Sequence, residues 1–186
     1  MPYHHGDLRR ALLDTALEAV GEQGPAAVSL RDVARRAGVS HAAPTHHFGD
    51  KTGLMTALAA EGWELLADAL AETAAEGDDF GALGVAYVVF ATSHPAHFAV
   101  MRAPGLARAD DPALEAAMAR AREQLEAGVR RFEGGSSDDA AVTALTAWSL
   151  VHGLAALILE GAVPLKPDAD VAELARAVTD RLRPPT

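Results

Sequence analysis

Three histidines crowd one short stretch of the chain, SHAAPTHHFGDK, which spans Ser40–Lys51. Imidazole nitrogens bind transition metals and act as general bases near neutral pH, so His41, His46 and His47 suggest a metal site or a catalytic centre. No carboxylate or cysteine joins these three histidines at ligand spacing, which disfavours the metal site. On a helix their side chains point in different directions, and we therefore expect them not to act together.

An enzyme that uses the histidines as general bases is the wider form of the same interpretation. The chain has no cysteine, which excludes disulfides, thiolate metal sites and cysteine nucleophiles. It also contains no nucleophile elbow, no phosphate loop and no cluster of paired carboxylates. We therefore predict no catalytic residue, no metal and no cofactor, and we interpret His94 and His97, beside Pro95, as structural.

The elements that must position these residues are helices. Apolar residues recur at helical spacing along the whole chain and no long stretch alternates with period two, so we predict an all-α fold. The residues predicted to cap helix N-termini are Ser29, Ser40, Asp50 and Asp111. The predicted helices cover about residues 7–23, 30–37, 41–48, 51–75, 80–93, 95–102, 112–132, 137–161 and 168–183.

The second and third of these helices have the lengths and the short glycine-containing turn of a helix-turn-helix unit. Gly38 is placed to adopt the left-handed conformation that ends the first of the two helices. In such a unit the second helix enters the major groove of DNA. When Pro44 and Phe48 pack inward, the helical phase turns three side chains outward, those of Ala42, Thr45 and His46.

We expect the DNA contacts to come from this second helix and from its two flanks. Small alanines allow close approach to a thymine methyl group or to the sugar-phosphate edge, and Lys51 suits a phosphate. The predicted DNA-binding residues are Ser29, Arg31, Ser40, His41, Ala42, Ala43, Thr45, His46 and Lys51. Arg35 and Arg36 are interpreted as a solvated helix face, and His47 as a packed histidine at the edge of the core.

The stretch SLRDVARRAGVSHAAPTHHFGDKTGLMTAL resembles the DNA-binding segment of the TetR/AcrR family of transcriptional repressors. The resemblance covers about residues 7–60 and combines the helix lengths, the AGVS turn, the His-Phe pair and the trailing lysine. It implies a three-helix DNA-binding domain over residues 1–52 and a helical domain over residues 53–186 that binds an effector and dimerises. It further implies a cytoplasmic homodimer that binds a double-stranded palindromic operator and is released by a small apolar or amphipathic molecule.

Two positions depart from the pattern of that family. The usual tyrosine is Thr45 here, which weakens or removes one contact with the DNA backbone. Where the family usually has Gly-x-Leu/Ile, this sequence has Ala43-Pro44. Pro44 should lose one hydrogen bond to the Ser40 carbonyl and tighten the first helical turn. A shorter likeness, to a subgroup with a Trp-x-x-x-His-Gly motif, rests on Trp148, His152 and Gly153.

Charge divides the chain into two parts. Residues 1–52 carry six basic and six acidic residues, whereas the remainder carries ten basic and twenty acidic residues and so the whole net charge of −10. A neutral module with few phosphate contacts binds DNA weakly, because affinity follows the number of phosphates neutralised. Two linked copies on a palindromic site offset this weakness, which supports a dimer.

The stretch AAVTALTAWSLVHGLAALIL, residues 140–159, has no charged residue and is long enough to cross a membrane. A polar residue recurs every three positions along it, which favours a helix sandwiched inside a soluble protein: Thr143, Thr146, Ser149 and His152. We therefore predict no membrane partner. The helix over 137–161 and the helix over 168–183 are the predicted four-helix dimer interface, as the family resemblance also implies.

Large side chains of the acidic part are candidates for lining an effector pocket, and each is equally a candidate for the core. These predicted ligand-binding residues are Trp63, Tyr87, Phe90, Phe98, Met101, Met118, Trp148 and His152. His152 either orients a ligand or is a buried histidine bonded to a backbone carbonyl. A DNA-binding dimer without any effector is the alternative function.

Overall fold

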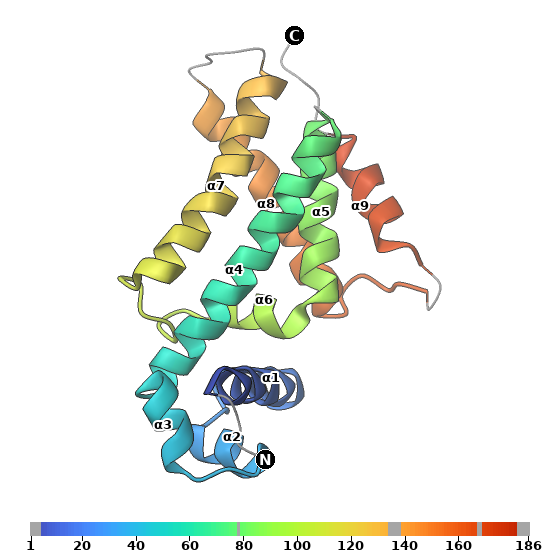
Figure 1. Cartoon of the computed structure of the whole chain (residues 1–186). Coiled ribbons are helices and arrows are strands. Elements are labelled where there is room, and N and C mark those ends of the chain that lie inside the picture. The colour runs from blue at the N-terminus through green and yellow to red at the C-terminus, as the bar shows by residue number, and fades with distance from the viewer. Residues whose placement is uncertain (1–4, 78, 134–138, 167–168, 182–186) are drawn as a thin grey trace. The chain divides into compact units, whose positions relative to one another are not determined.

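The computed structural model describes residues 5–77, 79–133, 139–166 and 169–181, and every regular element within these ranges is a helix (Figure 1). The helices are α1 (His5–Gln23), α2 (Leu30–Arg36), α3 (Ala42–Phe48), α4 (Lys51–Glu76), α5 (Phe80–Ser93), α6 (Pro95–Met101), α7 (Pro112–Phe132), α8 (Ala140–Leu159) and α9 (Val171–Thr179). The predicted all-α fold is confirmed.

The chain divides into two compact units. The first unit holds residues 1–63 and 95–117, and the second holds residues 64–94 and 118–186. Helix α4 begins in the first unit and ends in the second. This division follows packing rather than function, so the boundary expected after residue 52 stays a prediction.

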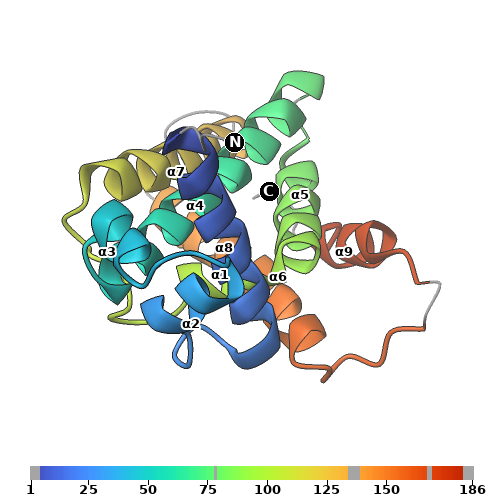
Figure 2. The same cartoon turned by 60° about the horizontal axis from the view of Figure 1, so that its bottom comes forward.

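In the first unit, α2 packs on α3 and both contact α1, as the view in Figure 2 shows from the side of these helices. The Ser29 hydroxyl caps α2 by accepting a hydrogen bond from the Asp32 amide at 3.2 Å. Gly38 ends the helix with a φ of 67°, as predicted, because only glycine adopts this conformation without a steric penalty. Buried apolar side chains of the three helices, among them Leu12, Val33 and Phe48, close the core of this unit.

In the second unit, α5 packs against both α8 and α9. Val88, Val151 and Ala175, one from each helix, form the centre of this core. The helices approach closely at Gly84, where a methyl group would stand 2.7 Å from Cγ2 of Thr179. Helix α9 therefore already buries part of its apolar face within the second unit.

Three sequence expectations are corrected or only partly covered. Ser40 does not cap α3, whose N-cap residue is His41, and that residue makes no side-chain capping bond. Helix α8 begins at Ala140 rather than at 137, and residues 134–138 lie outside the described residues. The helix predicted over 168–183 is α9, which covers Val171–Thr179. Residues 168, 182 and 183 of the predicted range also lie outside the described residues.

Helix α8 keeps much of its apolar surface uncovered by its own chain. By length and composition it could cross a membrane, and 17% of its most apolar 18-residue stretch is buried inside the protein. The exposed large side chains are Val142, Leu145, Trp148, Leu157 and Leu159. The other helices of this chain therefore do not enclose α8 as expected, and the surface that stays exposed is apolar.

Candidate nucleic-acid interface

Helix α3 presents one face to the core and the opposite face to solvent. Pro44 and Phe48 are buried, as the helical phase predicts. Ala42, Thr45 and His46 are exposed, and so are Ser40 and His41 before them, whereas Ala43 is half-buried. This outer face holds small and weakly polar groups and no lysine or arginine.

The first turn of α3 is tightened around Pro44. The Ser40 carbonyl accepts a hydrogen bond from the Ala43 amide at 3.0 Å, which is the i→i−3 pattern of a 3₁₀ turn. Proline has no amide hydrogen, so it cannot donate to the Ser40 carbonyl in the usual α-helical way. The predicted tightening is confirmed, and it brings the backbone of Ser40 close to the helix without a side-chain cap.

Lys51 follows α3 and is held by the turn between α1 and α2. Its ammonium group donates to the Ala26 carbonyl at 2.5 Å, which uses one of its three hydrogens. Ser29 is exposed beside this turn, and Arg31 is exposed on the first turn of α2. Among the residues that the structure describes, Arg31 makes no ion pair, so its guanidinium is available to an anion.

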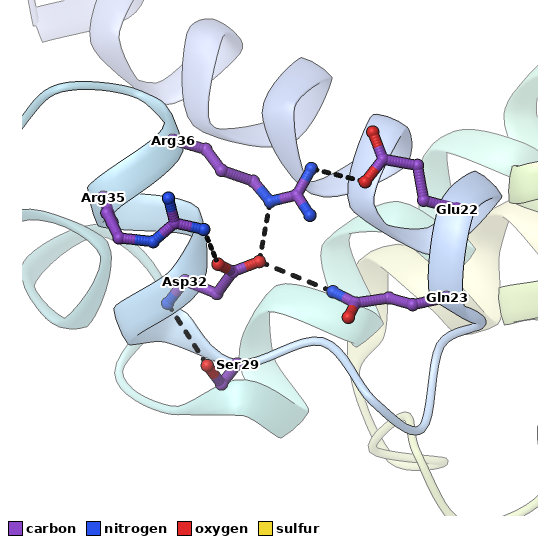
Figure 3. A network of polar contacts seen from close by, with 6 residues as sticks. All are labelled: Glu22, Gln23, Ser29, Asp32, Arg35 and Arg36. Carbon is purple, nitrogen blue, oxygen red and sulfur yellow. Dashed lines mark hydrogen bonds and ion pairs between the residues drawn. The ribbon is translucent and has the colours of Figure 1, made fainter.

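A polar network ties α1 to α2 and occupies two other arginines (Figure 3). The Asp32 carboxylate accepts hydrogen bonds from Arg35 at 2.5 Å and from Arg36 at 2.7 Å. Arg36 also donates to Glu22 of α1 at 2.7 Å, and Gln23 reaches Asp32 at 3.4 Å. Arg36 is therefore a bridge between two helices and not only a solvated residue as predicted, whereas Arg35 is largely exposed.

The hydrogen bonds of this network shift the pKa values of Asp32 and Arg36. Hydrogen bonds from Arg35 and then from Arg36 hold the pKa of Asp32 below its ordinary value of 3.8. Hydrogen bonds to Glu22 and then to Asp32 raise the pKa of Arg36. The two arginines are thus committed to carboxylates of their own unit, which lowers the number of cations that face outward.

Sequence reasoning missed further contacts of the first unit. Arg9 of α1 lies over the Phe48 ring, with 5.5 Å between its guanidinium carbon and the ring centroid. Arg10 donates to Glu61 of α4 at 2.7 Å, and this bond raises the pKa of Arg10. Glu61 also lies 3.2 Å from Nε2 of the buried His97, which supports the structural interpretation of that histidine.

The clustered histidines do not converge. The rings of His46 and His47 meet edge to face at 5.4 Å, and His47 also contacts the Phe48 ring, as expected of a packed residue. Within residues 5–77, 79–133, 139–166 and 169–181 there is no group of three or more His, Asp or Glu side chains placed to hold a metal ion. His94 instead stacks on Phe90, with 5.0 Å between the ring centroids.

The eight predicted ligand-binding residues fall into both units. Trp63, Phe98 and Met101 belong to the first unit, and the other five belong to the second. In the second unit the Tyr87 hydroxyl and Nδ1 of His152 are 2.6 Å apart, and the Trp148 ring lies 5.2 Å from the His152 ring. The structure brings these three together, so the half-buried His152 has a side-chain partner that the sequence did not predict.

Comparisons with known proteins agree with this arrangement. The family described as "Bacterial regulatory proteins, tetR family" matches residues 12–58, and the family described as "Tetracyclin repressor-like, C-terminal domain" matches residues 80–182. The transcriptional regulator BetI of Rhizobium meliloti is 49% identical over 49 residues, which cover 26% of this chain and 24% of BetI. The match thus spans about a quarter of the length of that curated relative.

Two solved structures are similar over nearly the whole chain. One is a protein of unknown function from Rhodococcus sp. RHA1, with 36% identity, 97% and 96% of the two chains covered and a TM-score of 0.77. The other is the multidrug binding protein EbrR complexed with imidazole, with 27% identity, 100% and 95% covered and a TM-score of 0.64. On the helix-turn-helix geometry and these matches, the chain belongs to the TetR family of bacterial transcriptional regulators.

Proposed function

We propose that this protein is a repressor that binds a palindromic double-stranded operator as a homodimer through α3 and is released by a small molecule. The observation that carries the proposal is the outer face of α3, where Ala42, Thr45 and His46 are exposed on a helix fixed to the core by Pro44 and Phe48. Such a helix can enter the major groove, and the small side chain of Ala42 lets its backbone come close to the bases.

The proposed interface combines this face with a few phosphate contacts. Arg31 and Lys51 supply cations, while hydroxyls and backbone amides near Ser29 and Ser40 supply neutral donors. Ala42 and Ala43 are suited to thymine methyl groups, and Thr45 offers a methyl and a hydroxyl. His41 and His46 complete the set of residues that we assign to DNA.

The proposed dimer forms through the exposed face of α8. Val142 and Leu145 are 62% and 59% exposed, and they share this face with Ser149 and Gly153. A methyl group at Gly153 would meet no atom within 4 Å, so this face has room for a close helix neighbour. Burial of the apolar side chains in a second copy would remove them from water, and α9 would contribute from its less buried side.

The second unit carries the candidate effector site. The Tyr87–His152 pair, with Trp148 beside it, provides hydrogen-bonding groups and aromatic surface in the second unit. These are the features by which an amphipathic molecule is recognised. The similar structure of EbrR is that of a multidrug binding protein, which supports a small-molecule ligand for the present chain.

Selection of duplexes from random DNA, followed by fluorescence anisotropy, tests the proposal. We expect enrichment of an inverted repeat whose half-sites lie about 34 Å apart, and binding of one dimer to each duplex. Failure to enrich any sequence above non-specific binding would contradict the account. A thermal-shift screen with amphipathic compounds then separates the two forms of the proposal, since a dimer without an effector shows no ligand that both stabilises the protein and releases DNA.

We further infer that the protein acts in the cytoplasm, by binding and without catalysis. The subgroup with the motif at Trp148, His152 and Gly153 stays a prediction. No cofactor and no membrane are needed for any step of this account.

A further inference from the structure

The segment between α6 and α7 returns to the corner between α3 and α4. Arg108 of this segment donates its backbone amide to the Thr56 hydroxyl of α4 at 2.9 Å. Thr56 is buried and donates in turn to the Thr52 carbonyl at 2.7 Å. The backbone of Arg108 is therefore anchored on the first turns of α4.

The Arg108 side chain reaches the residue that caps α4. Its Nη2 atom lies 2.8 Å from each oxygen of the Asp50 carboxylate. The same carboxylate accepts a hydrogen bond from the Gly53 amide at 2.8 Å. The bond from Gly53, and then the charge of Arg108, hold the pKa of Asp50 below its ordinary value, so Asp50 is negatively charged at neutral pH.

This negative charge stands at a position that matters for DNA. Asp50 comes two residues after Phe48, the last residue of α3, and directly before Lys51. A carboxylate at this corner repels the phosphates that Lys51 is proposed to meet, unless a cation neutralises it. Arg108 is the cation that contacts it, and it is 58 residues away in the sequence.

We propose that Arg108 is a positioning residue for DNA binding, because it neutralises Asp50 and holds the α3–α4 corner in the geometry that the operator requires. The inference rests on the proposed binding of DNA by α3. Arg108 acts through Asp50 in this account and does not itself contact a phosphate.

A double-mutant cycle at one selected operator tests the proposal. We expect Arg108→Ala to weaken binding by roughly three- to tenfold at low salt, because an unpaired carboxylate then faces the phosphates. Asp50→Asn removes that charge, and asparagine still caps the helix. We therefore expect the double variant Asp50→Asn/Arg108→Ala to bind more tightly than Arg108→Ala alone.

Two further readouts separate this role from simple loss of structure. The loss caused by Arg108→Ala should shrink between about 50 and 200 mM salt, since screening weakens the repulsion. Arg120→Ala is the matched control, because Arg120 likewise pairs with an aspartate, Asp68 of α4, at 2.6 Å and with similar exposure. Arg120→Ala should leave operator affinity unchanged.

The outcomes are distinguishable. A loss that Asp50→Asn does not reverse would overturn the inference and identify Arg108 as a direct phosphate contact or a purely structural residue. Unchanged binding by Arg108→Ala would overturn it as well. A wild-type protein that binds no selected duplex would overturn the proposed function, and the inference with it.

Discussion

A methyl group at Gly53 would stand 2.0 Å from the carbonyl oxygen of Phe48, the last residue of α3. Gly53 is buried in the first turn of α4, and Arg108 closes its other side, with Nη1 at 2.8 Å from the same methyl position. The α3–α4 corner therefore depends on the absence of a side chain at this residue. A methyl group would fit here only if the Phe48 carbonyl or the first turn of α4 moved, and either movement would displace α3.

The first prediction concerns this corner. We expect Gly53→Ala to lower the free energy of unfolding by about 2 kcal/mol or more, because overpacking against backbone forces the helices apart. Urea unfolding followed by circular dichroism measures it. Gly21→Ala in α1 is the control, since a methyl group there meets no atom within 4 Å. It should stabilise the protein by roughly 0.5–1 kcal/mol, and equal effects of the two variants would contradict the packing argument.

The second prediction concerns acid stability and the Asp32 network. The folded protein holds the pKa of Asp32 below 3.8, chiefly through Arg35 and Arg36, so the unfolded chain binds a proton at higher pH than the folded one. The stabilisation is complete from about pH 5 upward, well above the unfolded pKa, and is lost as the pH falls through the folded pKa. When the pH falls from about 5 to 3, the free energy of unfolding should therefore decrease less for Asp32→Asn than for the wild type. Thermal unfolding at a series of pH values checks this, and curves of the same slope would contradict it.

The third prediction concerns the dimer. Leu145→Arg places a charge on the exposed α8 face, and we expect a folded monomer at micromolar concentration by light scattering. Operator binding should weaken by about two orders of magnitude or more, because the second half-site is then no longer bound intramolecularly. Ala119→Arg, at an exposed position of α7, should remain a dimer. A dimeric Leu145→Arg protein would place the interface elsewhere.

The fourth prediction concerns base recognition. The exposed face of α3 has no arginine, lysine, asparagine or glutamine for bidentate base contacts, so apolar contact with thymine methyl groups should supply part of the specificity. Replacing contacted thymines of the operator by deoxyuridine should cost about 0.8 kcal/mol for each methyl removed. The same replacement in flanking DNA should cost nothing. Equal affinity of all such duplexes would show that the alanines face the sugar-phosphate edge instead.

Local signals made much of the fold predictable from the sequence. The caps at Ser29 and Asp111 and the turn at Gly38 are read from neighbouring residues, and the structure has all three. Ser40 failed as a cap because His41 already has helical dihedral angles, φ −60° and ψ −21°, and the tightened turn uses the Ser40 carbonyl instead.

The remaining features depend on partners that are distant in the sequence. Arg108 and Asp50, like Tyr87 and His152, carry no periodic or motif signal that would pair them. The apolar composition of α8 indicates burial but does not say in which chain the burial occurs. The helix is mostly uncovered within its own chain, and the dimer partner that is expected to cover it stays a prediction.

Operator binding by Ala42→Asp tests the central claim most directly. The account predicts that an aspartate on the outer face of α3 reduces specific operator affinity to the level of non-specific binding, because its charge meets phosphates and base-edge acceptors at close range. Helical content and the dimer should be retained, and Ala119→Asp on α7 should bind as the wild type does. An Ala42→Asp protein with wild-type operator affinity would show that α3 is not the helix that reads DNA.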